Sequence, residues 1–306
     1  MPKLKYQFLP NACPEAADIL ILPVPLENTV SYKEGTANAP EGIIRAGEQL
    51  EYYEEDAAWS PLLHMNISVL DAFSAKINED ESTTHQRLYE TVNALPQKNL
   101  LVALGGEHSI TPAIVAARMP TPGTVIQLDA HADLRSQFNG SPYNHACPMH
   151  RIREQQHALI MIGIRSLTEE EALRINNDED ITAYMDRQLR HASAWPSLLK
   201  SLSSLTGDVW LTIDMDAFDP GLIPGVGTPQ PGGISWHQSI DILEAVIYNR
   251  NINLRGLDLV ELTPEPTRVS EITAAKLIQK AISFWGKAHK YDQKPKSGSQ
   301  SHVDYH

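Results

Sequence analysis

Leu128-Asp129-Ala130-His131-Ala132-Asp133 is the stretch that decides the interpretation of this chain, and Ile213-Asp214-Met215-Asp216-Ala217-Phe218-Asp219-Pro220 repeats its pattern far downstream. Each stretch follows a short apolar run that has the length and composition of a buried strand, 124–128 in the first case and 209–213 in the second. Ionisable residues then occupy alternate positions, which an extended chain would place on one side. Crowded carboxylates repel each other and lose hydration unless a cation or protons lie between them. The pattern therefore predicts a site for divalent metal ions, as in two-metal hydrolases.

The apolar runs recur along the chain and alternate with amphipathic stretches. We expect strands at Asp18–Val24, Ile67–Leu70, Leu100–Leu104, Thr124–Leu128, Leu159–Ile164, Val209–Ile213 and Leu254–Val260. We expect helices at Pro40–Glu51, Thr84–Ala94, Pro112–Ala117, Thr168–Asn176, Trp195–Ser203, Trp236–Tyr248 and Ser270–Phe284. Strands that alternate with helices indicate βαβ units and a mainly parallel sheet covered on both faces. The expected fold is thus a single three-layer α/β/α domain over residues 1–290, and the polar segment 291–306 should be a flexible tail.

Composition narrows the class of protein. The chain has 306 residues, of which 42% are hydrophobic, and a formal net charge of −13. This charge argues against nucleic acid or an anionic membrane as a partner. It would attract a small cationic substrate, although a role in solubility explains it equally well. The two cysteines do not form a disulfide framework, and the apolar runs are too short to span a membrane, so we expect a cytoplasmic protein.

A third polar motif, Gly105-Gly106-Glu107-His108, also follows an expected strand. In open α/β sheets the ligand site lies at the carboxyl ends of the strands, so all three motifs should meet there. The alternative is a cluster of ion pairs, but Arg135 is the only basic residue near the first acidic stretch and 209–218 contains none. Asp219 precedes a proline and is better interpreted as a turn residue than as a ligand.

The candidate ligands are two histidines and four carboxylates, without a thiolate. Oxygen-rich ligation with some imidazole favours two Mn²⁺ per chain over Zn²⁺, with Ni²⁺, Co²⁺ and Fe²⁺ as alternatives. Two such ions, about 3.5 Å apart, would lower the pKa of water enough to supply a nucleophile near neutral pH.

Several motifs in order resemble the ureohydrolases, the arginase–agmatinase family of binuclear manganese enzymes, and among them agmatinase most closely. The motifs are Gly105-Gly-Glu-His-Ser109, Asp129-Ala-His-Ala-Asp133, His145-Ala-Cys-Pro148, Asp214-Met-Asp-Ala-Phe-Asp-Pro220, Gly227-Thr-Pro-Gln-Pro-Gly-Gly233 and Val260-Glu-Leu-Thr-Pro264. The stretches Pro23–Arg45 and Ser270–Leu277 look agmatinase-like as well. The resemblance extends from about residue 18 to residue 285.

This resemblance implies a ligand set. One metal would be held by His108, Asp129, Asp133 and Asp214. The other would be held by His131, Asp129, Asp214 and Asp216, so that Asp129 and Asp214 bridge the two ions.

It also implies three catalytic residues. Asp133 would take a proton from the attacking water and pass it to the leaving amine. His145 would move protons at the mouth of the site, where an ordinary histidine pKa suits that task. Glu261 would bind the substrate guanidinium, whose planar fork matches a carboxylate. From the residues alone, His145 is better interpreted as a loop histidine that binds backbone. Glu261 could be a surface residue at a strand end.

The reaction implied is hydrolysis of a guanidino group to urea and an amine, with agmatine as the expected substrate and putrescine as the product. Arginine and guanidinobutyrate stay open, because the loop 134–144 offers Arg135, Ser136, Asn139, Ser141 and Asn144 as partners for a carboxylate. Guanidine is a further alternative substrate. Two positions depart from the family: Glu107 replaces a common aspartate, and Gln230 replaces a common glutamate. The family further suggests a homotrimer or homohexamer.

Two other classes compete with this interpretation. A binuclear phosphoesterase would need basic residues around its phosphate, and the motif flanks have few besides Arg135. A non-catalytic relative usually lacks a metal ligand, whereas all six candidate positions are filled here.

Overall fold

The computed structural model describes residues 12–76 and 79–295. Its strands are β1 Ile19–Val24, β2 Ile67–Val69, β3 Leu100–Gly105, β4 Thr124–Leu128, β5 Ala158–Ile164, β6 Ile181–Met185, β7 Gly207–Asp214 and β8 Ile252–Val260. Its helices are α1 Ala39–Gly47, α2 Glu81–Asn93, α3 Thr111–Arg118, α4 Pro148–Glu154, α5 Glu169–Asn177, α6 Asp186–Leu189, α7 Ala194–Ser203, α8 Trp236–Ile247 and α9 Val269–Ala288. None of the helices in these ranges combines the length and apolarity needed to cross a membrane.

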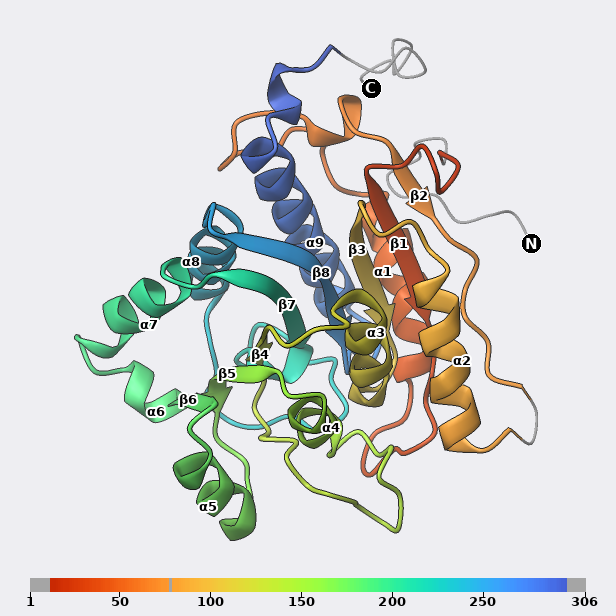
Figure 1. Ribbon diagram of the computed structural model, residues 1–306. Helices are drawn as coiled ribbons and strands as arrows, with labels where there is room; N and C mark the ends of the chain where they lie inside the picture. Colours follow the sequence, from red (N-terminus) through yellow and green to blue (C-terminus); the bar gives the residue numbers. More distant parts are fainter. Residues whose placement is uncertain (1–11, 77–78, 296–306) are drawn as a thin grey trace.

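The strands form one parallel sheet of eight, in the order β2-β1-β3-β8-β7-β4-β5-β6. After β3 the chain skips two places to β4, and β7 and β8 later fill the gap between them (Figure 1). The carboxyl ends of β3, β8, β7 and β4 are therefore neighbours, although their residues lie far apart in the sequence. The expected α/β fold with a mainly parallel sheet is confirmed.

Both faces of the sheet are buried, as the continuous apolar strands predict. In β1, Ile19 and Ile21 pack into one hydrophobic cluster, while Leu20 and Leu22 pack into the cluster on the opposite face. Helices α1, α7, α8 and α9 supply the first cluster, and α2, α3 and α4 supply the second. The alternation of side chains along each strand thus builds the three layers.

The sequence did not predict β6, α4 or α6. Most of β6 is only half-buried, at the edge of the sheet, so it lacks the apolar run that marked the other strands. The helices α4 and α6 are short and show little periodicity. At the other end, α9 continues past Phe284 to Ala288, and a 3₁₀ turn follows at Tyr291–Gln293. The rest of the expected tail, 296–306, lies outside the described residues.

Helix α9 carries a buried lysine. The ammonium of Lys280 is fully buried and contacts the carboxylates of Glu54, Glu55 and Asp56, with a distance of 2.8 Å to Glu55 Oε1. This ion-pair cluster attaches the loop before β2 to the face of α9.

Candidate metal centre and active site

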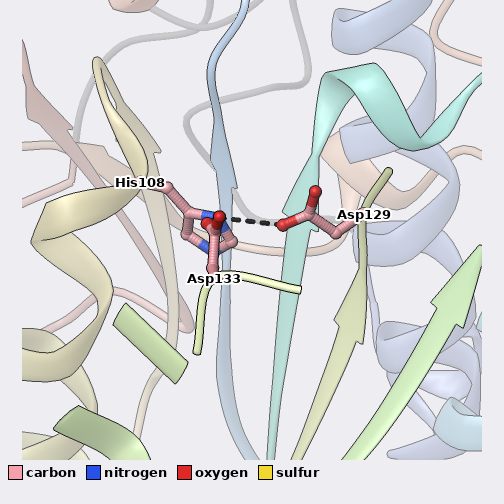
Figure 2. Close-up of side chains that lie close together, drawn as sticks. All are labelled: His108, Asp129 and Asp133. Carbon is pink, nitrogen blue, oxygen red and sulfur yellow. Dashed lines mark ion pairs between the residues drawn. The ribbon is translucent and has the colours of Figure 1, made fainter. Parts of the chain in front are cut away.

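The carboxyl ends of the four central strands bring the sequence-predicted residues together. His108 Nδ1 lies 3.2 Å from Asp129 Oδ2, 3.1 Å from Asp133 Oδ2 and 3.4 Å from Asp214 Oδ2. Figure 2 shows the side chains of His108, Asp129 and Asp133 directed toward one another. These three residues can offer one ligand atom each to a single ion.

A second group adjoins the first and shares Asp129 with it. His131 Nδ1 lies 3.0 Å from Asp216 Oδ2 and 3.7 Å from Asp129 Oδ1. His131, Asp129 and Asp216 can likewise hold one ion. The six residues expected from the sequence therefore lie together, as two adjoining groups that share Asp129.

The backbone achieves this in a different way from the extended geometry expected above. Asp129 Oδ1 accepts the backbone N–H of His131 at 2.6 Å, and Asp214 Oδ1 accepts that of Asp216 at 2.9 Å. Each aspartate thus forms a turn with the residue two positions ahead. The oxygen left over, Oδ2, faces His108 in both cases. The two acidic stretches share this turn, which explains their common spacing.

Asp133 and Glu261 also depart from extended geometry. Their φ angles are 53° and 62°, in the left-handed region that residues other than glycine rarely adopt. Such conformations concentrate at functional sites, where surrounding contacts hold them.

The turn before His108 needs a glycine because the backbone comes very close to another segment: a Cβ on Gly106 would lie 2.0 Å from the carbonyl oxygen of Leu26. This close approach places the Gly-Gly turn, and with it His108, against the loop after β1.

The hydrogen bonds around His108 show that its inward nitrogen suits a metal. Its Nε2 lies 2.9 Å from Thr212 Oγ1, and that hydroxyl donates to Asp258 Oδ1 at 2.5 Å. Nε2 then donates to that hydroxyl, so in the neutral imidazole the lone pair lies on Nδ1. Nδ1 is buried and makes no hydrogen bond with the described residues, yet it faces three carboxylates. A divalent cation between them would satisfy both the lone pair and the charges.

The electrostatics of two of the aspartates agree with this fit. Burial and the charges of Asp216 and Asp129 raise the pKa of Asp214 well above its ordinary value. Burial and the charge of Asp129 raise the pKa of Asp133 to about 7. These shifts reflect the repulsion that a cation would relieve.

The alternative of carboxylates neutralised by lysine or arginine does not hold here. Within 12–76 and 79–295, no lysine or arginine lies within ion-pairing distance of Asp129, Asp133, Asp214 or Asp216. The acidic group Glu54–Asp56 is the contrast, since the ammonium of Lys280 lies among its carboxylates. Asp219, expected to be a turn residue, accepts the backbone N–H of Gly221 at 2.8 Å.

A cavity of about 220 Å³ opens beside the two groups and connects them to the other site residues. His131, Asp133, His145, Asp214 and Glu261 all border it. The carboxylate of Glu261 is buried, and its Oε1 accepts the backbone N–H of His108 at 2.6 Å. Burial, together with the charges of Glu107 and Asp216, raises the pKa of Glu261 to about 8. A cationic group in the cavity would offset the negative charge of the ionised Glu261 carboxylate.

The loop 134–144 contributes less to the cavity than the sequence suggested. Arg135 borders it, with its guanidinium 4.5 Å from the centre of the Phe138 ring. Ser136, Asn139, Ser141 and Asn144 do not border it. The hydroxyl of Ser141 instead donates a hydrogen bond to the carboxylate of Glu81, because the loop folds back toward α2.

The sequence analysis did not identify the residues that hydrogen-bond to the candidate ligands or to the loops that carry them. Arg165 donates to the backbone carbonyls of Asp216 and Gln230, at 2.7 and 3.0 Å, and so ties two loops together. The side-chain amide of Gln230 lies 3.3 Å from His131 Nε2. Thr212 and Asp258 sit within apolar strands. Gln230 stood out only as a departure from the family pattern, and no local signal marks Arg165, Thr212 or Asp258, because their partners are distant in the chain.

Fold and site together define a metal-dependent α/β enzyme with its centre at the carboxyl edge of a parallel sheet. More narrowly, the chain belongs to the arginase family, whose model matches residues 17–283. This family implies a binuclear metal centre, and the two His/Asp groups described above could hold it.

Several relatives of the chain are ureohydrolases of the agmatinase type. The chain is 34% identical to the N(1)-aminopropylagmatine ureohydrolase of Synechocystis sp., over 90% of this chain and 91% of that protein. It is 32% identical to the agmatinase of Pyrococcus horikoshii, with 88% and 93% covered. The crystal structure of agmatine ureohydrolase from Thermoplasma volcanium superposes with a TM-score of 0.81 at 28% identity, covering 95% of this chain and 96% of that one. The expected enzyme class, a hydrolase of amidine C–N bonds, is confirmed.

Proposed function

We propose that this protein hydrolyses agmatine to putrescine and urea, a step of polyamine biosynthesis, with two Mn²⁺ bound per chain. The observation that carries the proposal is the single cavity in which Glu261 and His145 adjoin Asp133, Asp214 and His131. The similarity to agmatinases supports a guanidino substrate. The formal charge of −13 supports a substrate whose far end is also cationic.

His108, Asp129, Asp133 and Asp214 would hold one ion, and His131, Asp129, Asp214 and Asp216 the other. The donor set supports this, since it combines carboxylate oxygens with two imidazoles and contains no sulfur. Such ions would lower the pKa of water and stabilise developing negative charge.

Three side chains would bind the substrate and transfer protons. Glu261 would bind and orient the guanidinium, because its buried carboxylate lacks a cationic partner among the described residues. Asp133 would accept the proton of the attacking water and pass it to the leaving amine, since its carboxylate borders the cavity next to the metal-binding groups. His145 would move protons at the cavity mouth.

N(1)-aminopropylagmatine is a second candidate substrate. Relatives from three organisms, 32 to 34% identical, are named for its hydrolysis. It shares the guanidino end with agmatine and adds a cationic extension. Arginine and guanidinobutyrate remain alternatives, since Arg135 at the cavity could face a carboxylate.

The experiment is urea release from agmatine, N(1)-aminopropylagmatine, arginine, guanidinobutyrate and guanidine. The protein should be reconstituted separately with Mn²⁺, Ni²⁺ and Co²⁺, with bound metal measured in each sample. We expect agmatine with Mn²⁺ to give the highest kcat/KM. A protein that binds two ions per chain but releases no urea from any member of the panel would refute the proposal.

We further propose a homotrimer or homohexamer in the cytoplasm, without nucleic acid or membrane partners. The two free cysteines, one exposed and one buried, support a reducing compartment. Light scattering of the purified protein tests the assembly.

A further inference from the structure

One hydroxyl holds His145 by both its side chain and its backbone. Thr29 Oγ1 lies 3.0 Å from His145 Nδ1 and also 3.0 Å from the backbone nitrogen of His145. The same hydroxyl lies 3.0 Å from Glu107 Oε2. Glu107, Thr29 and His145 therefore form a chain of hydrogen bonds, although they come from three separate segments of the sequence.

The direction of each hydrogen bond follows from counting donors. Glu107 Oε2 accepts the backbone N–H groups of Asn28 and Thr29, at 2.9 and 2.7 Å, so this oxygen acts as an acceptor. Oε1 accepts the hydroxyl of Ser109 at 2.6 Å. Thr29 has a single hydroxyl proton, and a carboxylate oxygen that already accepts two N–H groups is its natural destination.

The hydroxyl oxygen of Thr29 is then left as an acceptor for both nitrogens of His145. The backbone N–H donates to it, and the ring can approach it at 3.0 Å only by donating from Nδ1. The other ring nitrogen, Nε2, lies 3.3 Å from the hydroxyl of Ser31, which also borders the cavity. That hydroxyl can rotate away without breaking the chain.

We propose that Glu107 and Thr29 are positioning residues that hold His145 in the tautomer protonated on Nδ1, so that Nε2 is the nitrogen that exchanges protons at the cavity. This inference rests on the proposed catalytic role of His145. It gives the glutamate at position 107 a function of its own, because its side chain reaches the loop 28–29 while the next residue, His108, faces the metal centre. A buried carboxylate acting through a hydroxyl thus fixes a histidine tautomer, much as a direct carboxylate does in other catalytic sites.

Thr29→Val tests the proposal, since valine keeps the shape of threonine and removes its hydroxyl. We expect kcat to fall about 10-fold to 100-fold while KM for the guanidino substrate changes less than about 2-fold. Thr29→Ser should restore kcat, because serine keeps the hydroxyl. Bound metal should stay at the wild-type level in both variants.

The tautomer itself can be read by ¹⁵N NMR of histidine-labelled protein loaded with a diamagnetic ion such as Zn²⁺. The wild type and Thr29→Ser should show His145 protonated on Nδ1, and Thr29→Val should lose that signature. Ser31→Ala is the matched control, because it removes the hydroxyl facing Nε2 and should keep the Nδ1 proton. The measurement on the wild type needs no variant, so misfolding of a variant cannot hide the answer.

A wild-type His145 protonated on Nε2, or a Thr29→Val variant with unchanged tautomer and kcat, would overturn the inference. Urea release by the wild type would leave the proposed function standing in that case. Conversely, absence of urea release with every guanidino substrate would defeat the proposed function, while the NMR signature would still decide the tautomer.

Discussion

At the residue scale, Asp129 and Asp214 use their two oxygens differently. In each, Oδ1 accepts a backbone N–H and closes a turn, while Oδ2 faces His108. An asparagine could keep the turn through its carbonyl oxygen but would present no charge to a metal. Replacing either aspartate by asparagine should therefore keep the local turn while removing a charged metal ligand.

Asp129→Asn should leave a folded protein that binds fewer than two ions per chain and shows no urea release above background. Inductively coupled plasma mass spectrometry and a urea assay measure the two effects. Asp219→Asn is the matched control, because Asp219 makes the same kind of turn with Gly221 away from the His/Asp groups. Full metal content and turnover in Asp129→Asn would contradict the shared-ligand assignment.

Glu261→Gln isolates the charge of Glu261 from its structural contact. Glutamine can still accept the backbone N–H of His108, which Glu261 Oε1 accepts at 2.6 Å. Losing a charge-assisted interaction of about 1.5–3 kcal/mol should raise KM for guanidino substrates about 10-fold to 100-fold. Steady-state kinetics with unchanged metal content would check this. Unaltered KM would place the guanidinium elsewhere in the cavity.

His145→Ala should lower kcat about 100-fold or more while both ions stay bound, since a general acid or base contributes at least that much. No carboxylate of the two metal-binding groups is paired with His145 in the described chain. Kinetics and metal analysis on the same sample distinguish the outcomes. If the variant lost metal, His145 would be a ligand instead.

At the scale of elements, α9 anchors the loop before β2 through a buried ammonium. Lys280 and Glu54 are both fully buried, so removal of one partner leaves an uncompensated charge inside the protein. Lys280→Met should reduce the free energy of unfolding by about 3–5 kcal/mol. Urea denaturation of the metal-loaded protein measures the loss.

Lys276→Met on the same helix is the control for that loss. Lys276 is partly exposed and pairs with the exposed Glu55, so its removal should change stability by only about 1 kcal/mol or less. Equal effects of the two substitutions would show that the buried cluster contributes no more than a surface pair.

At the scale of the whole molecule, four strands from distant parts of the chain meet at the metal centre. A cation there binds the folded state in preference to the unfolded one, because only folding assembles its ligands. At an ion concentration about 100 times Kd, each site stabilises the fold by about 2.7 kcal/mol. Removing the metal should therefore lower the Tm by several degrees.

Calorimetry before and after chelation, followed by addition of Mn²⁺, measures this coupling. We expect the Tm to fall and then recover, and the shift to be smaller in Asp129→Asn. A Tm that stays constant while metal analysis confirms complete removal would mean that the acidic groups do not depend on a cation for stability.

Much of the fold could be predicted because both faces of the sheet are buried. Continuous apolar runs marked every strand except β6, whose half-exposed position at the sheet edge removes that signal. The positions of the acidic motifs after β4 and β7 followed from the same runs. The geometry at Asp129 and Asp214 was not predictable, because turns that depend on a side chain accepting a backbone N–H leave the same spacing as an extended segment.

The sequence by itself determined the class of secondary structure, the family and the six candidate ligands, since each of these depends on local composition and spacing. The tertiary structure decided that β7 and β8 insert between β3 and β4, which makes His108, Glu261, Asp214 and Asp129 neighbours. It also decided the hydrogen-bond partners of the site histidines, such as Thr29 for His145 and Thr212 for His108. The physical reason is that strand order and long-range hydrogen bonds depend on how helices and sheet pack together, and local periodicity carries no information about that packing.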